Sequence, residues 1–85
     1  MFLEIITPDE KVFEGEVNSA IFPGSDGYFQ VLNDHANMVS SLGQGDVQFK
    51  YKEGDEDKET HILIEGGIVE VRNNKVMVLA ESLVD

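Results

Sequence analysis

Residues 46–52 have the sequence Asp-Val-Gln-Phe-Lys-Tyr-Lys and alternate strictly between polar and apolar side chains. An alternation with period two is typical of a β-strand that buries one face and exposes the other. It predicts that Val47, Phe49 and Tyr51 face the core. The polar residues of the stretch are expected on the solvent side.

The same period continues along the chain in both directions. Further strand-like segments span residues 2–6, 12–22, 28–32, 38–42, 60–65, 68–72 and 75–80. No segment has the period of an amphipathic helix. Short strands at this spacing predict an all-β fold, an antiparallel β-sandwich or flattened barrel of about 8–10 short strands.

The alternation also predicts which side chains share a face. The expected groups are Leu3 and Ile5; Val17, Ser19 and Ile21; Ile62 and Ile64; Val69 and Val71; and Val76, Val78 and Ala80. Gly15, between two glutamates, is expected to make a bulge or bend. Met77 and Leu79 give residues 75–80 a second apolar face, which predicts a central strand or one covered by a partner.

Turn residues separate the strands. The segment Pro23–Gly27 combines a Pro, which sets φ, with two glycines that tolerate positive φ, and so predicts a tight turn. Asn73-Asn74 suits a type I′ hairpin turn. The charged residues 53–59 are expected to form a hairpin tip. The polar residues 33–37 are expected to form an irregular connection or a single helical turn.

Composition excludes several classes of function. The chain has 85 residues, with 17 acidic against 6 basic side chains, a formal net charge of −11 and no Cys. We expect one domain, residues 1–85, whose core is small enough that a stabilising partner is plausible. Because nucleic acids and anionic bilayers attract Lys and Arg, the charge argues against binding nucleic acid or lipid directly. The apolar runs are too short to span a membrane, and residues 1–10 do not resemble a secretory signal, so a cytoplasmic location is expected.

Catalysis has one weak candidate. His35 follows Asp34, as a general base and its orienting carboxylate would, and Ser40 and Ser41 are the nearest nucleophiles. Adjacent loop residues seldom point to a common position, and the sequence has no nucleophile elbow. We therefore expect no catalytic residue. A loop hydrogen bond or a protein contact explains His35 better.

No metal or cofactor site is expected either. Asp55, Asp57 and Glu59 alternate like the first ligands of an EF-hand calcium loop. The sixth and twelfth positions of such a loop would be Thr60 and Gly66, where Gly and Glu are required. The two histidines of the chain are far apart in sequence and lack further ligands at zinc spacing.

Lys58 suggests one alternative function. Lipoyl and biotinyl carrier domains are also acidic β-sandwiches of about this size, and they carry the modified Lys at a hairpin tip. Acidic residues precede Lys58, but Glu59 follows it where those domains usually have a small or apolar residue. A carrier domain modified at Lys58 is therefore kept as the alternative.

Six segments of the chain together point to a family. They are Ile6-Thr7-Pro8-Asp9, Val12-Phe13-Glu14-Gly15-Glu16-Val17, Pro23-Gly24-Ser25-Asp26-Gly27, Asn33-Asp34-His35-Ala36-Asn37, Gly66-Gly67-Ile68-Val69-Glu70-Val71 and residues 76–81. In this order and at this spacing they resemble the epsilon subunit of the F-type ATP synthase. The resemblance covers essentially the whole chain, and it is to the N-terminal β-sandwich domain of that family.

The chain departs from the family pattern in three places. The family usually has Pro-Gly-His-Ala-Pro where this chain has Asn33-Asp34-His35-Ala36-Asn37, so only the central His-Ala is kept. Tyr28 stands where the family often has Glu or another small or polar residue. The family's second domain, a C-terminal helical hairpin, is absent from residues 1–85, which corresponds to a short form.

The resemblance implies a non-catalytic subunit of the central stalk, or rotor. Epsilon-like subunits bind the gamma subunit, rest on the membrane c-ring and help couple proton flow to ATP synthesis. The implied location is the cytoplasmic face of the energy-transducing membrane, peripheral through the complex. Because inhibition of ATP hydrolysis and nucleotide binding belong to the helical hairpin, neither is expected here.

The resemblance also implies which residues face partners. Tyr28 is expected toward the c-ring, and His35, Ala36, Met38 and Ser40 toward gamma or the junction of gamma with the c-ring. Tyr is a favoured interface residue because it buries a large area and keeps a polar group, and Met adapts to irregular surfaces. Core packing explains Met38 equally well.

Overall fold

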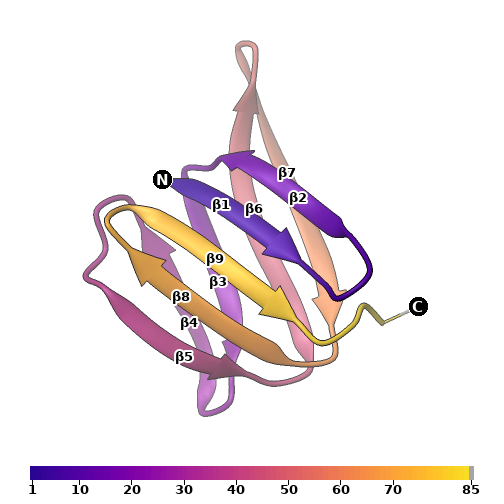
Figure 1. Cartoon of the computed structure of the whole chain (residues 1–85). Helices are drawn as coiled ribbons and strands as arrows, with labels where there is room; N and C mark the ends of the chain where they lie inside the picture. Colours follow the sequence, from indigo (N-terminus) through magenta and orange to yellow (C-terminus); the bar gives the residue numbers. More distant parts are fainter. Residues whose placement is uncertain (85) are drawn as a thin grey trace.

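A computed structural model describes residues 1–84, whose regular structure consists of β-strands (Figure 1). The strands follow the alternating segments of the sequence, with turns between them. They are β1 (Phe2–Ile6), β2 (Lys11–Glu16), β3 (Ser19–Gly24), β4 (Gly27–Leu32), β5 (Met38–Leu42), β6 (Gly45–Glu53), β7 (Glu56–Ile64), β8 (Gly67–Arg72) and β9 (Lys75–Ala80).

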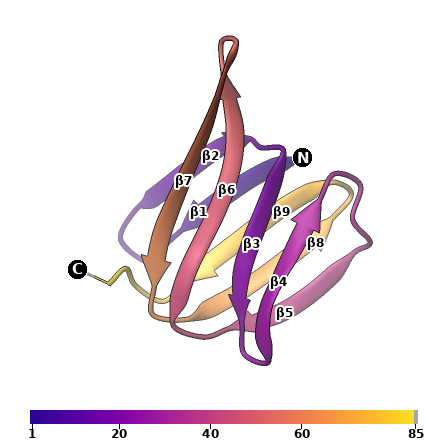
Figure 2. The same cartoon turned by 180° about the vertical axis from the view of Figure 1, so that it is seen from behind.

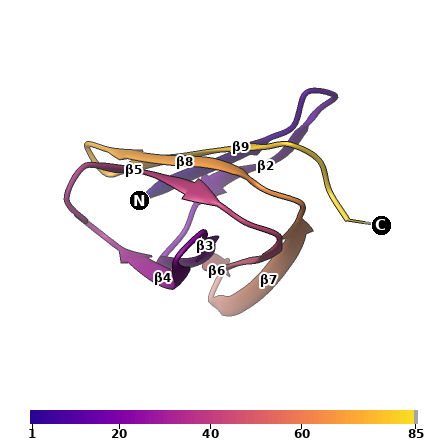
Figure 3. The same cartoon turned by 90° about the horizontal axis from the view of Figure 1, so that it is seen from below.

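The strands form one sheet that curls over on itself. Their order is β2-β1-β9-β8-β5-β3-β6-β7, and β4 pairs with β3. Figure 3 shows two layers, with β5, β8, β9, β1 and β2 in one and β4, β3, β6 and β7 in the other. The layers are joined where Gly24 of β3 pairs with Leu42 of β5. The predicted all-β class is confirmed, in the form of a half-barrel or sandwich.

One strand pair is parallel, whereas the sequence predicted an antiparallel fold. β1 pairs with β9 from Phe2 opposite Lys75 to Ile6 opposite Leu79. These two strands come from opposite ends of the chain, so no tight hairpin forces them to run antiparallel.

The core lies between the two layers and consists of alternate residues along the strands. Val47 and Phe49 are 0% and 1% exposed, and Tyr51 packs against the core, as the alternation of residues 46–52 predicted. The faces predicted in β1, β7, β8 and β9 also point inward. The buried core residues are Met1, Leu3, Ile5, Val17, Ala20, Phe22, Val31, Leu42, Val47, Phe49, Ile64, Val69, Val71, Val76, Val78 and Ala80.

Residues 12–22 are rich in strand and Val17 is buried, as predicted, but the predicted common face of Val17, Ser19 and Ile21 was wrong. The segment is divided between β2 and β3, and the chain leaves the ladder between Glu16 and Ser19. The interruption changes which residues face inward, so that Ala20 and Phe22 are buried while Ser19 and Ile21 are half-buried. The expected bulge at Gly15 is also absent, because the β1–β2 register is regular there and shifts instead between Ile5 and Ile6.

Most of the predicted turns are present. Asn73 and Asn74 have φ of 50° and 63°, which confirms a turn of type I′ character. The β3–β4 hairpin turns at Ser25 and Asp26, and Gly27 has a φ of 129°. The hairpin tip predicted over residues 53–59 was too long. The β6–β7 ladder continues to Glu53 opposite Glu56, because cross-strand pairing tolerates charged residues that face solvent.

Candidate partner interface

The residues predicted to face partners lie on β4, on β5 and in the loop between them. Tyr28 is near the start of β4, and His35 and Ala36 are in the loop beyond its other end. Met38 and Ser40 are on β5, which returns toward the β3–β4 turn. Figure 3 shows this loop crossing from one layer to the other at one side of the molecule. The structure thus brings these residues to one side, with Tyr28 and His35 at opposite ends of it.

Tyr28 is exposed but held in place. Its side chain is 57% exposed, and its hydroxyl accepts a hydrogen bond from the Asp46 backbone N–H at 3.0 Å. The hydroxyl lies over Gly45, where a Cβ atom would collide with it. A fixed aromatic ring with large exposed area can enter an interface at a low cost in side-chain entropy.

The 33–37 loop is irregular, and His35 is fixed within it. Its backbone N–H donates to the Leu32 carbonyl at 3.1 Å. Its Nδ1 lies 2.7 Å from the Ala36 carbonyl, and because a carbonyl only accepts, Nδ1 is the donor. The neutral imidazole therefore has Nε2 as its acceptor nitrogen. This loop contains no helical turn.

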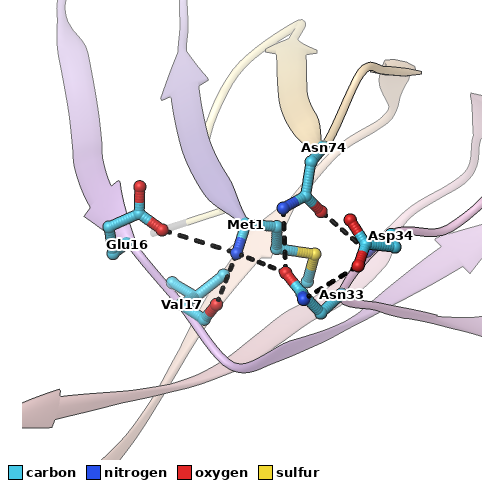
Figure 4. Close-up of polar contacts among 6 residues, drawn as sticks. All are labelled: Met1, Glu16, Val17, Asn33, Asp34 and Asn74. Atoms are coloured by element: carbon cyan, nitrogen blue, oxygen red, sulfur yellow. Dashed lines mark hydrogen bonds and ion pairs between the residues drawn. The ribbon is translucent and has the colours of Figure 1, made fainter.

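The loop is tied to the β8–β9 turn by asparagine side chains. The Asp34 N–H donates to Asn74 Oδ1 at 2.8 Å, and the Asn73 N–H donates to Asn37 Oδ1 at 2.9 Å. Figure 4 shows the first of these contacts together with Asn33. Asp34 has a φ of 62°, the left-handed conformation that favours Gly. It occupies the position of the Gly in the family's usual loop sequence.

Met38 and Ser40 lie on the inner face of β5. They pair with Val71 and Val69, which are buried, and paired residues share a face of the sheet. Met38 accordingly packs against the core, and Ser40 is half-buried. Val39, between them, points outward.

Exposed apolar side chains that were not among the predicted partner-facing residues flank the loop. Val39 is 67% exposed and Leu32, at the end of β4, is 52% exposed. Strand alternation indicates that Val39 faces opposite to its neighbours, so this signal was present in the sequence. Together with Tyr28, His35 and Ala36 these two residues define what we call the β4–β5 surface.

The catalytic and metal candidates are not assembled. Asp34 Oδ2 accepts from Asn33 Nδ2 at 3.3 Å, while the His35 ring bonds to a backbone carbonyl, so the two are not arranged as a base and its orienting carboxylate. In the described part of the chain, no group of three or more His, Cys, Asp or Glu side chains could hold a metal ion. Residues 1–84 also contain no helix with the length and apolar character needed to cross a membrane.

Lys58 does not have the geometry of a carrier lysine. It lies within β7 opposite Tyr51, whereas the hairpin tip is at Gly54 and Asp55. Its Nζ lies 3.0 Å from Glu56 Oε2 on the same strand. A carrier lysine extends from the tip to reach separate active sites, and Lys58 is set back from it.

Comparison with known proteins gives a consistent result. The family model described as "ATP synthase, Delta/Epsilon chain, beta-sandwich domain" matches residues 1–85. A protein named ATP synthase epsilon chain from Maridesulfovibrio salexigens is 44% identical over 95% of this chain and 54% of its own length. A protein of the same name from Chlorobium limicola is 41% identical over 95% of this chain and 89% of its own length. The chain thus spans about half of the first relative and most of the second.

Two solved structures contain a chain with this fold. A chain of the Euglena gracilis mitochondrial ATP synthase, solved with OSCP, F1 and c-ring, matches with a TM-score of 0.84 and 25% identity over 96% of this chain and 51% of that one. A chain of the Tetrahymena thermophila mitochondrial ATP synthase, in its central stalk and c-ring, matches with a TM-score of 0.81 over 99% of this chain and 65% of that one. At 17% identity the second match shows the fold alone.

Proposed function

Since this chain belongs to the ATP synthase delta/epsilon family, as its match to the β-sandwich domain over residues 1–85 shows, we propose that it acts as a rotor subunit of the central stalk. In this role it binds the gamma subunit and the c-ring and helps couple proton flow to ATP synthesis. It performs no chemistry itself. It is peripheral to the energy-transducing membrane, on the cytoplasmic face, and is held there by the complex.

The β4–β5 surface is the proposed rotor contact. Tyr28, Leu32 and Val39 place large exposed apolar side chains on the two strands that flank the 33–37 loop. Exposed apolar side chains on both strands beside a fixed loop are typical of protein interfaces. His35 adds a polar side chain and Ala36 a small apolar one from the loop, and Met38 and Ser40 support the surface from the inner face of β5.

In this role residues 1–85 act as one β-sandwich domain. They are expected neither to bind nucleotide nor to inhibit ATP hydrolysis through a helical hairpin. Calorimetric titration of the domain with ATP is expected to show no saturable heat. Saturable binding at micromolar ATP would contradict this part of the proposal.

The binding proposal is tested by recovering the rotor from native membranes with the tagged chain. The tag belongs at the C-terminus, because the amino group of Met1 is buried. Recovery of gamma and c-ring subunits is expected. Val39→Asp is expected to reduce recovery at least about tenfold, because it places a charge in an apolar contact. The matched control is Leu63→Asp on the distant strand β7, which also replaces an exposed apolar residue. Equal recovery of the rotor by the two variants, with both folded, would exclude the β4–β5 surface as the rotor contact.

A further inference from the structure

The α-amino group of Met1 lies inside a polar network (Figure 4). Met1 is 6% exposed. Its ammonium nitrogen donates to the Val17 carbonyl and to Asn33 Oδ1, both at 3.2 Å, and Glu16 Oε2 lies 3.4 Å away. A protonated amino group has three N–H bonds, and the site offers three acceptors.

The network connects this nitrogen to the 33–37 loop. Asn33 Oδ1, which accepts from the amine, also accepts from Asn74 Nδ2 at 2.9 Å. The oxygen of the same Asn74 amide accepts the Asp34 N–H at 2.8 Å. The amine therefore orients the amide of Asn33, which orients that of Asn74, which holds the backbone of Asp34. We call these four residues the amine relay.

Two members of the amine relay have an unfavourable backbone conformation. Asp34 and Asn74 have φ of 62° and 63°. Left-handed backbone costs free energy for residues other than Gly, so it persists only where the surroundings hold it. For Asp34 the side-chain amide of Asn74 supplies part of that restraint, whereas the φ of Asn74 is set by the β8–β9 turn.

We propose that the free α-amino group of Met1 positions the 33–37 loop, and that a formyl group, an acetyl group or a preceding residue on that nitrogen loosens the loop. An acylated nitrogen has one N–H and no charge. That N–H can still donate to the Val17 carbonyl. The Val17 N–H in turn donates to the Met1 carbonyl at 2.9 Å, so the two residues extend the β1–β2 ladder. Asn33 Oδ1 then keeps only the N–H of Asn74 Nδ2 as its donor, and Glu16 loses its ion pair with the amine.

The proposal makes the Met1 nitrogen a modification site with a structural effect. On a chain made with N-formylmethionine, hydrolysis of the formamide takes up one water and releases formate and the free amine. This step completes the amine relay. Any consequence for the rotor, through His35 and Ala36, rests on the proposed function.

The test compares three forms of the isotope-labelled chain by amide hydrogen exchange in NMR. They are the free amine, verified by mass, the N-acetylated chain, and the chain with one Gly before Met1. The amide of Asp34 is expected to exchange about tenfold faster in the two blocked forms, as the loss of one charge-assisted hydrogen bond implies. The amide of Phe49, in the core, is expected to stay protected.

A second variant keeps the proposal testable if a blocked chain fails to fold. Asn33→Ala retains the free amine and removes Asn33 Oδ1, which links the amine to Asn74, so the Asp34 amide is expected to exchange faster in the same way. Asn18→Ala is the matched control, because Asn18 is exposed and its side chain takes no part in the amine relay. Unchanged Asp34 exchange in the blocked forms, with Phe49 protected, would overturn the proposal; if neither blocked form folds, unchanged exchange in Asn33→Ala would overturn it.

Rotor recovery with the same proteins separates the two proposals. If blocking the amine loosens the loop and lowers recovery, both are supported. If it loosens the loop and leaves recovery unchanged, the positioning role holds and the rotor contact does not involve this loop.

Discussion

At the scale of single residues, the 33–37 loop shows how hydrogen bonds take the place of rigid residues. The family usually fixes this loop with two prolines and a Gly, whereas this chain has Asn33, Asp34 and Asn37. Asn33 and Asn37 bond across to the β8–β9 turn, and Asp34 adopts the left-handed conformation. Pro limits φ covalently, while the asparagines obtain a similar restraint from tertiary contacts.

The backbone of Asp34 gives the prediction at this scale. Asp34→Gly is expected to change the free energy of unfolding by less than about 1 kcal/mol, because relief of left-handed strain offsets the greater freedom of the unfolded chain. Asp34→Val is expected to destabilise the protein by about 1–2 kcal/mol, since a β-branched residue fits this conformation poorly. Urea unfolding measures both.

The control for this prediction is Asp26→Val in the β3–β4 turn. Asp26 is also an exposed turn Asp, but it is not among the residues with positive φ. If Asp34→Val were no more destabilising than Asp26→Val, left-handed strain at Asp34 would not be the cause.

At the scale of strands and hairpins, Lys11 forms ion pairs within β2 and with β1 at one edge of the sheet. Lys11 at the start of β2 places its Nζ 2.8 Å from Glu14 Oε2 and 3.2 Å from Glu4 Oε2. The hydrogen bond from Lys11 lowers the pKa of Glu14 below its ordinary value of 4.5. The hydrogen bonds that Lys11 donates to Glu14 and Glu4 raise the pKa of Lys11 above 10.5.

These shifts set the pH range in which the β1–β2 hairpin gains stability. The pKa of Glu14 is lower in the folded state, so its contribution is present above 4.5 and is lost as pH falls through the folded value. The pKa of Lys11 is raised, so its contribution is present below 10.5 and is lost as pH rises through the folded value. Both groups are exposed, so the effect on stability is small.

Lys11→Met is therefore expected to raise the pKa of Glu14 toward 4.5. Titration of the side-chain carboxyl carbon by NMR measures this directly. The control variant Lys52→Met removes a Lys from the distant β6–β7 hairpin and is expected to leave Glu14 unchanged. An identical titration of Glu14 in wild type and Lys11→Met would show that the pair is not formed in solution.

At the scale of the whole molecule, excess negative charge surrounds a small core. The net charge of −11 is carried by 85 residues, and part of it is concentrated on the β6–β7 hairpin, which projects from the body (Figures 1 and 2). Like charges repel in the compact state and relax on unfolding. The proposed rotor partners are thus expected to present basic groups to this subunit. Added salt is expected to weaken that attraction by screening the charges.

Added salt is therefore expected to stabilise the isolated chain. Raising NaCl from about 10 mM to about 500 mM should raise Tm by about 5 °C, because screening relieves the repulsion. Circular dichroism at the two salt concentrations measures it. A variant with Glu53→Lys and Asp55→Lys at the hairpin tip, which is less negative, should show a smaller rise. A Tm that fell with salt would mean that ion pairs outweigh the repulsion.

The sequence by itself determined the all-β class, most of the strands and the core faces of residues 46–52 and 75–80, because period-two alternation is a local property of a half-buried strand. It also indicated the loop that carries His35. Alternation failed where it was carried across Asn18, since a break between strands changes which side chains face inward. Only the tertiary structure decided that β1 and β9 pair in parallel and that Met38 faces inward. The amine relay likewise joins Met1 to Asn33 and Asn33 to Asn74, which are 32 and 41 positions apart in the sequence. The curling of the sheet creates this proximity, and no local pattern encodes it.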